Sequence, residues 1–164
     1  MADAGLFGDA WEPLSEDEET EVWDRFCQAF AFRPSVHSDK FPGIAEPHRS
    51  ATWALPPRDV VVASESNLHA KMLAAFRETT PADSMLYALD WQHRCYRFRP
   101  HADFDVWMIP VWPDAEYTIF LAPDLSFGTF GHPWEWTLCV FGHGLLTVLD
   151  RDPPEVLNDL VRGR

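Results

Sequence analysis

The residues best suited to chemistry lie in two short stretches that combine titratable and aromatic side chains. The first is the run Leu89-Asp90-Trp91-Gln92-His93, and the second is FGTFGHPWEW, residues 127–136. Each lies where a predicted strand meets a turn. We therefore take these two stretches as the candidate functional sites.

Glu135 is the first candidate for a catalytic group. Gly128 and Gly131 allow a tight backbone shape ahead of it. Strand alternation places Glu135 on the same face as Thr137 and Cys139. Burial there would raise the pKa of the carboxyl, which suits a general acid or base near neutral pH. The alternative interpretation is a structural ion pair with an arginine on a neighbouring strand.

Three further residues complete the catalytic hypothesis. Asp90 and His93 would act as partner and orienter, and His132 as a second proton-transfer group. His93, His132 and either Asp90 or Glu135 would formally make a metal site of two histidines and one carboxylate. They come from distant segments without dense ligand spacing, so we expect no metal and no other cofactor.

Two arginines are candidates for ligand binding. Arg97 and Arg99 alternate out of one strand face and would clamp a carboxylate or phosphate. The alternative is cross-strand pairing with Asp103, Asp105 or Glu135.

The tryptophans also have two interpretations. Several indoles at strand ends would wall a pocket for an apolar or cationic ligand, and those assigned to it are Trp91, Trp107, Trp134 and Trp136. Alternatively, the indoles fill the core of a two-layer protein, where each buried N–H needs an acceptor.

Helices are predicted ahead of most of the strands. Ser15 and Glu18 form a capping box. Apolar residues then recur every fourth position to Phe30, which predicts a helix that Pro34 ends. The same spacing predicts a second helix over residues 64–77.

The remainder of the chain is predicted to be mainly strands. Apolar runs predict five of them, at residues 85–91, 95–99, 104–111, 117–122 and 134–141. Shorter apolar runs indicate strands at residues 52–55 and 60–62, and a short helix or edge strand at 145–149. The expected fold is α+β, a mostly antiparallel sheet of about five to six strands with two or three helices packed on one side.

Length and composition fit one globular domain. The 164 residues are 46% hydrophobic and 24% charged, which excludes collagen, coiled coil and wholesale disorder. We expect a single domain over residues 1–164 with a core at about 11–149 and flexible ends at 1–10 and 151–164.

Charge and cysteine usage restrict the partners. Thirteen basic against 26 acidic residues give a net charge of −13, which repels nucleic acid and anionic membranes. No signal peptide or membrane-spanning run is visible. Cys27, Cys95 and Cys139 lack C-x-x-C spacing and fit buried free thiols in a reducing cytoplasm. We expect a cytoplasmic protein that binds a small molecule or a basic protein.

Five separated runs also form a recognisable pattern. They are VWDRF from Val22, FRPS from Phe32, LDWQH from Leu89, YRFRP from Tyr96 and FGTFGHPWE from Phe127. Together they resemble a bacterial family known only as domain of unknown function 2716, over roughly residues 11–146. The resemblance implies no activity, cofactor or catalytic residue, so function rests on the residues themselves.

Two functions from different classes follow. One is a small cofactor-free enzyme that uses acid/base groups in an aromatic-lined pocket for cyclisation, elimination or hydrolysis, in the tailoring of a specialised metabolite. The other is an acidic binding protein of the immunity type, which neutralises a basic toxin or sequesters a ligand. Convergent titratable groups at strand ends favour the enzyme, because a protein interface has no need of them.

Overall fold

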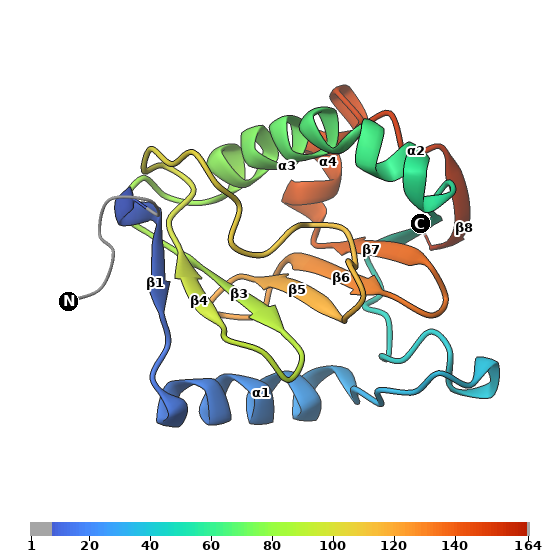
Figure 1. Cartoon of the computed structure of the whole chain (residues 1–164), viewed down its shortest axis with the longest axis horizontal. Coiled ribbons are helices and arrows are strands. Elements are labelled where there is room, and N and C mark those ends of the chain that lie inside the picture. The colour runs from blue at the N-terminus through green and yellow to red at the C-terminus, as the bar shows by residue number, and fades with distance from the viewer. Residues whose placement is uncertain (1–7, 164) are drawn as a thin grey trace.

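A single antiparallel sheet lies between two layers of helices in the computed structural model, which describes residues 8–163 (Figure 1). The helices are α1 (Glu16–Phe30), α2 (Arg58–Ala63), α3 (Glu65–Thr79) and α4 (His143–Arg151). Short 3-10 turns, η1 and η2, cover Gly8–Ala10 and Ser38–Lys40. None of the helices in this described part is long and apolar enough to cross a bilayer.

The sheet has eight strands within residues 8–163, in the spatial order β1-β4-β3-β5-β6-β7-β2-β8. In chain order the strands are β1 (Trp11–Pro13), β2 (Ser50–Ala54), β3 (Leu86–Asp90), β4 (Tyr96–Phe98), β5 (Thr118–Leu121), β6 (Gly128–His132), β7 (Thr137–Phe141) and β8 (Asp159–Gly163). The α+β class and the antiparallel sheet are confirmed. The expectation of five to six strands is wrong.

The difference in strand number has specific causes. Both edge strands were missed, β1 because it has only 3 residues and β8 because it carries no alternating apolar pattern. Strand β6 was expected to be a loop on account of its glycines. A Cβ at Gly128 would lie 2.1 Å from the carbonyl oxygen of Phe120 on the neighbouring strand, so glycine permits the close approach here. The apolar run 104–111 is irregular, whereas 60–62 and 145–149 are helical.

Helices cover both faces of the sheet, which corrects the expected packing on one side. Figure 1 shows α1 beneath the sheet and α2, α3 and α4 above it. Strands β5, β6 and β7 are buried at every position, so each face requires a cover. The core is accordingly divided into two clusters. One lies between α1 and the sheet and includes Phe26 and Phe130, and the other lies between α3 and the sheet and includes Phe76 and Phe120.

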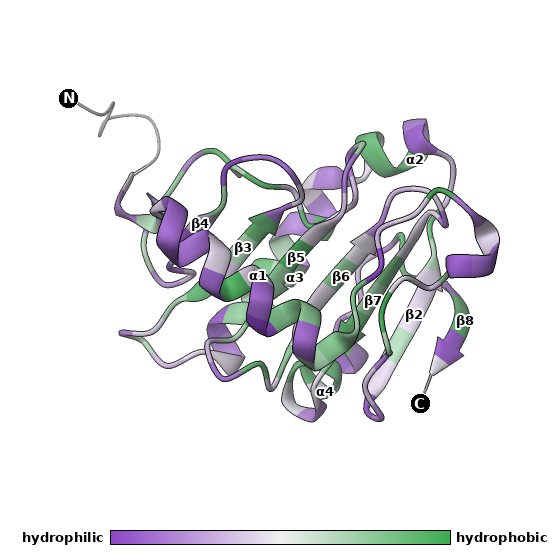
Figure 2. Cartoon of the chain, turned by 90° about the horizontal axis from the view of Figure 1, so that it is seen from below, coloured by the Kyte–Doolittle hydropathy of each residue, from purple (hydrophilic) through white to green (hydrophobic). Residues whose placement is uncertain are grey.

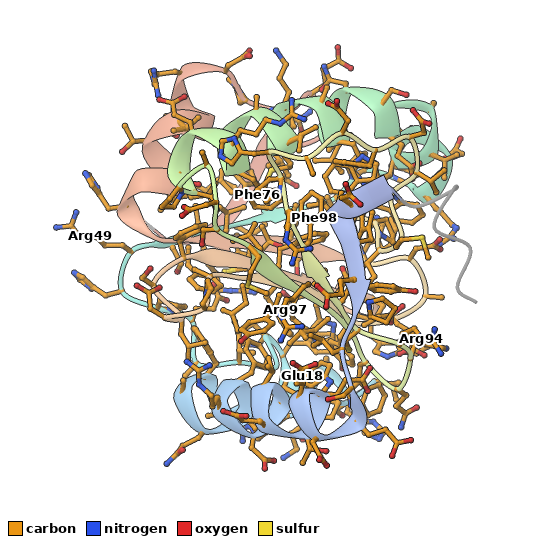
Figure 3. All side chains as sticks on the ribbon, turned by 90° about the vertical axis from the view of Figure 1, so that its left-hand side faces the viewer. Glu18, Arg49, Phe76, Arg94, Arg97 and Phe98 are labelled. Carbon is orange, nitrogen blue, oxygen red and sulfur yellow. The ribbon has the colours of Figure 1, made fainter. Side chains whose placement is uncertain are left out.

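Helix α1 begins and packs as the sequence predicts. The Ser15 side chain accepts the N–H of Glu18, and the Glu18 carboxylate accepts the N–H of Ser15, which completes the capping box. The helix ends at Phe30, and Ala31 caps it in the left-handed conformation (φ 51°). Glu18 also pairs with Arg97 on β4, and Figure 3 shows the two side chains pointing toward one another between helix and sheet.

The C-terminal segment is part of the sheet, although the sequence suggested a loosely held tail. Strand β8 pairs antiparallel with β2, with a register shift between Thr52 and Trp53. Ahead of it, Val156 and Leu157 are only 2% and 7% exposed. Figure 2 shows hydrophilic residues on β8, and because of them the composition of the segment did not predict that it packs against the core.

Deleting residues 151–164 should therefore destabilise the fold. Two large apolar side chains, Val156 and Leu157, would lose burial, which contributes roughly 3–6 kcal/mol in total. Denaturant unfolding measures the loss. Removing only residues 159–164 is the matched control, because it keeps both buried side chains and should cost less. An unchanged unfolding midpoint after the longer deletion would contradict this expectation.

Candidate functional site

A groove of about 780 Å³ lies between α1 and the turn that follows β3. Its walls are aromatic, formed by Trp23 of α1, Phe32 and Trp91. Its polar lining comes from both sides and consists of Glu16, Glu19, Cys27, Gln92, His93 and Arg94. Apolar walls with a few convergent polar groups are typical of small-molecule sites.

Packing beneath the groove fixes its aromatic walls. The indole of Trp23 stacks on Phe32 at 5.8 Å between ring centroids. The indole of Trp91 meets the ring of Tyr117 edge-on at 5.7 Å. The Tyr117 hydroxyl accepts the N–H of Ser35 at 2.7 Å and donates to the Ser35 carbonyl at 2.8 Å. The groove is thus held by side chains that have defined partners.

The turn after β3 carries the Asp90–His93 pair. The Asp90 carbonyl accepts the N–H of His93 at 3.1 Å, and the Asp90 Oδ1 lies 3.2 Å from the His93 Nδ1. Burial raises the pKa of Asp90, and its hydrogen bond with His93 opposes that shift. The Asp90 carboxylate is 24% exposed and the His93 ring 58% exposed. A carboxylate therefore orients an accessible imidazole at the groove.

Backbone strain marks the same turn. Gln92 has φ 66°, a left-handed conformation that favours glycine. A non-glycine residue there costs about 1–2 kcal/mol. Such strain persists where surrounding structure enforces it, and it is common at functional sites.

The Glu135 carboxylate belongs to a separate, half-buried cluster, the Glu135–Arg162 network, made of Glu46, Thr52, Glu135, Thr137 and Arg162. Arg162 on β8 donates to both oxygens of Glu135, at 2.5 and 3.1 Å, and to Glu46 at 2.5 Å. Thr137 donates to Glu135 at 2.7 Å, and Thr52 to Glu46 at 2.5 Å. This bidentate geometry ties β8 to the β6–β7 turn and to the loop before β2.

The network corrects the expected ionisation of Glu135. Burial alone would raise the pKa of this carboxyl, but hydrogen bonds from Arg162 and Thr137 hold it below its ordinary value. The raised pKa expected of a general acid is wrong. An arginine does pair with Glu135, and it is Arg162 of β8 rather than Arg97 or Arg99.

His132 is buried at the end of β6 and has no exposed surface. Its Nδ1 accepts the backbone N–H groups of Trp134 and Glu135, at 3.2 and 3.1 Å. Burial lowers the pKa of the ring to about 4, so it is neutral near pH 7. A Cβ at Gly43 (φ 85°) would lie 3.2 Å from the imidazole, so glycine permits the loop to lie against the ring. His132 organises the β6–β7 turn.

Arg97 and Arg99 make ion pairs and do not line the groove. Arg97 pairs with Glu18 and lies 3.8 Å from Glu12, and Arg99 pairs with Glu12 at 3.0 Å. Structural pairing thus describes both arginines. Their partners lie on β1 and α1 instead of being Asp103, Asp105 or Glu135, because β1 is the neighbour of β4 in the sheet.

The four tryptophans assigned to one pocket are dispersed. Trp91 lines the groove. Trp107 packs on the opposite face of the sheet and stacks on His69 at 4.3 Å. Trp134 is 55% exposed, and the indole N–H of Trp136 donates to the Pro56 carbonyl at 2.6 Å. Trp134 and Trp136 lie in the β6–β7 turn, where the alternation expected of a strand does not hold.

The structure thus brings the candidates together in two pairs. Asp90 lies with His93, and His132 lies with Glu135, at the same end of the sheet. Tyr117 lies between the pairs, contacting Trp91 on one side and His132, at 4.8 Å, on the other. The groove and the Glu135–Arg162 network are therefore separate.

Sequence reasoning missed several residues of both places. The α1 side of the groove, with Glu19, Trp23 and Cys27, was assigned only to helix capping and packing, although Trp23 belongs to one of the recognised runs. Cys27 is exposed rather than buried. His69, to which sequence reasoning assigned no role, is 7% exposed and accepts the N–H of Val111 at 3.1 Å. Across residues 8–163, no group of three or more His, Cys, Asp or Glu side chains is arranged to hold a metal ion.

Comparison with known proteins places the chain in a family. It belongs to the family described as protein of unknown function (DUF2716), whose model matches residues 13–146. It is 32% identical over 154 residues to the uncharacterized protein YxiI of Bacillus subtilis strain 168, covering 88% of this chain and 94% of that protein. No solved structure matches the chain. The resemblance seen in the sequence is confirmed, and its runs at Val22, Phe32 and Leu89 contribute to the groove.

Stability should fall as the pH is lowered from 6.5 to 4, because burial lowers the pKa of both His69 and His132 to about 4. In that window the unfolded chain binds protons that the folded protein does not, so unfolding becomes easier. Each histidine contributes roughly 3 kcal/mol over the window. Urea unfolding at a series of pH values measures the slope, and His69→Gln should reduce it. A flat profile would contradict this expectation, because it would mean that the folded protein takes up as many protons as the unfolded chain over this range.

Glu135→Gln should destabilise the protein by about 1–3 kcal/mol at neutral pH, because Arg162 loses one of two carboxylates in a half-buried setting. The contribution of Glu135 is present above the pKa of the unfolded carboxyl and is lost as pH falls through its depressed folded value. Unfolding curves of wild type and variant should therefore converge in acid. Glu12→Gln is the control, since its exposed pair with Arg99 should cost less than about 1 kcal/mol. Equal losses for both variants would contradict the structural role of the network.

Proposed function

We propose that the protein is a small enzyme that carries out acid/base chemistry on a small molecule bound in the groove between α1 and the turn after β3. No cofactor is part of this mechanism. The reaction class is cyclisation, elimination or hydrolysis, each of which needs a proton moved at the substrate. Tailoring of a specialised metabolite is one setting for such a reaction.

The observation that carries the proposal is the Asp90–His93 pair at an aromatic groove. With the His93 Nδ1 engaged by the Asp90 carboxylate, the neutral tautomer places a lone pair on Nε2, which can accept a proton. When it does so, the ring becomes an imidazolium whose charge Asp90 stabilises. The proton then returns to the leaving group or product from the same nitrogen, so the enzyme regains its initial state.

The catalytic hypothesis for the second stretch changes with the geometry. Glu135 is held as an ionised partner of Arg162, and His132 is enclosed by Phe41 and Tyr117. Both support the β6–β7 turn in this proposal. Proton transfer is assigned to His93 and orientation to Asp90.

Substituting His93→Gln should abolish turnover and leave the fold and ligand binding intact. A thermal-shift screen of metabolites from the neighbouring pathway supplies a ligand, since one at 100 times its dissociation constant adds about 2.7 kcal/mol. With that ligand as substrate, His93→Gln should lower kcat roughly a hundredfold or more. His37→Gln is the matched control, because His37 is exposed and lies outside the groove. Full activity of the His93 variant would disprove the catalytic assignment.

A second candidate function is favoured by the surface beside the groove. The first turn of α1 carries Glu16, Asp17, Glu18 and Glu19, and the net charge of the chain is −13. Such a surface attracts a basic protein, as neutralisation of a toxin requires. Co-expression with a basic toxin encoded beside the gene tests this function. Rescue of growth that is lost on Asp17→Lys would support neutralisation, and rescue unaffected by that change would not.

A further inference from the structure

We propose that the groove recognises an organic cation, an ammonium or guanidinium group attached to an apolar body. The inference rests on the proposed function, because it names the substrate class for the same groove. Two features carry it: a pair of indoles on facing walls, and carboxylates at the rim that no basic side chain neutralises.

The indoles come from different elements and face a common space. Trp23 projects from α1 and Trp91 from the turn after β3, and both are half-buried and line the groove. Their positions are fixed by Phe32 and Tyr117, respectively. The face of an indole attracts a cation within about 6 Å, and aromatic walls are the usual means of binding alkylammonium groups.

The carboxylates at the groove are Glu16 and Glu19. Glu16 is exposed, and Glu19 is half-buried with its Oε1 fixed by the backbone N–H of Cys95 at 2.9 Å. Within the part of the chain that the structure describes, no lysine, arginine or histidine pairs with either one. Their neighbour Glu18, by contrast, is neutralised by Arg97. Two carboxylates of α1 that line the groove are therefore available to a ligand.

Two basic groups on the opposite rim limit this charge. They are Arg94 and, when protonated, His93, and both line the groove. Figure 3 shows Arg94 at the outer margin of the turn. The imidazole is held by Asp90, which leaves Arg94 as the group that opposes a cation. Its removal should strengthen cation binding, whereas it should weaken binding of an anion.

The test uses three probes with one apolar body and different charge: phenethylammonium, 2-phenylethanol and 3-phenylpropionate. Binding to the full chain at neutral pH is followed by NMR, through the indole N–H signals of Trp23 and Trp91. We expect the ammonium to bind at least about fivefold more tightly than the alcohol, and the carboxylate to bind most weakly. Equal affinity for the alcohol, tighter binding of the carboxylate, or no perturbation of either indole by the ammonium would overturn the proposal.

Variants separate recognition from a general effect of charge or fold. Trp91→Leu and Glu16→Gln should each weaken ammonium binding about threefold or more, and Arg94→Gln should strengthen it. The controls are Trp134→Leu, an exposed indole outside the groove, and Asp17→Asn, the same charge change one residue from Glu16. Thermal melts confirm that each variant is folded. Equal effects of Glu16→Gln and Asp17→Asn would show that net charge alone explains the weaker binding, and would overturn the proposed site.

The readout also distinguishes this inference from the proposed function. His93→Gln should keep the ammonium preference, because recognition rests on the indoles and carboxylates. A protein that prefers the ammonium but retains activity without His93 would refute the acid/base assignment alone. A protein that needs His93 for turnover and binds the alcohol as tightly as the ammonium would refute the cation specificity alone.

Discussion

Burial of both faces of the central strands is the constraint on which the rest of the structure depends. Strands β5, β6 and β7 have apolar or hydrogen-bonded side chains in both directions, so one layer of helices cannot cover the sheet. The single helix α1 covers the lower face only in part. On the side of the turn after β3, the space that α1 leaves uncovered is the groove. On the side of β2, the Glu135–Arg162 network and the loop before β2 cover the sheet instead of the helix.

Local signals in the sequence predicted the elements that form locally. The capping box at Ser15, the helix that includes Phe76 and the paired strands around Leu89 and Phe98 follow from short-range patterns. The second helical layer and both edge strands do not follow from such patterns, because they form only by packing against, or pairing with, segments distant in the chain. Arg162 illustrates the limit. Nothing near it in the sequence indicates a partner, because its partners Glu135 and Glu46 lie 27 and 116 residues away in the chain.

The candidate site was predicted in part for the same reason. The run Asp90-Trp91-Gln92-His93 is contiguous, so its turn and its carboxylate–imidazole pair are local, and the structure places them together. The opposite wall comes from α1, and only the packing of that helix against the sheet brings Trp23 into the same groove as Trp91. The strand alternation predicted around Glu135 is wrong, because its neighbours Trp134 and Trp136 lie in a turn, with φ 62° at Trp136.

The charge distribution connects the fold with the proposed chemistry. With 13 basic and 26 acidic residues, carboxylates outnumber their possible partners. Two half-buried arginines form structural ion pairs, Arg97 with Glu12 and Glu18, and Arg162 with Glu46 and Glu135. The carboxylates left at the groove favour a cationic substrate. Under the proposed chemistry, a cation bound near His93 would oppose the imidazolium that forms when Nε2 takes a proton, so the Asp90 carboxylate would have to offset that charge.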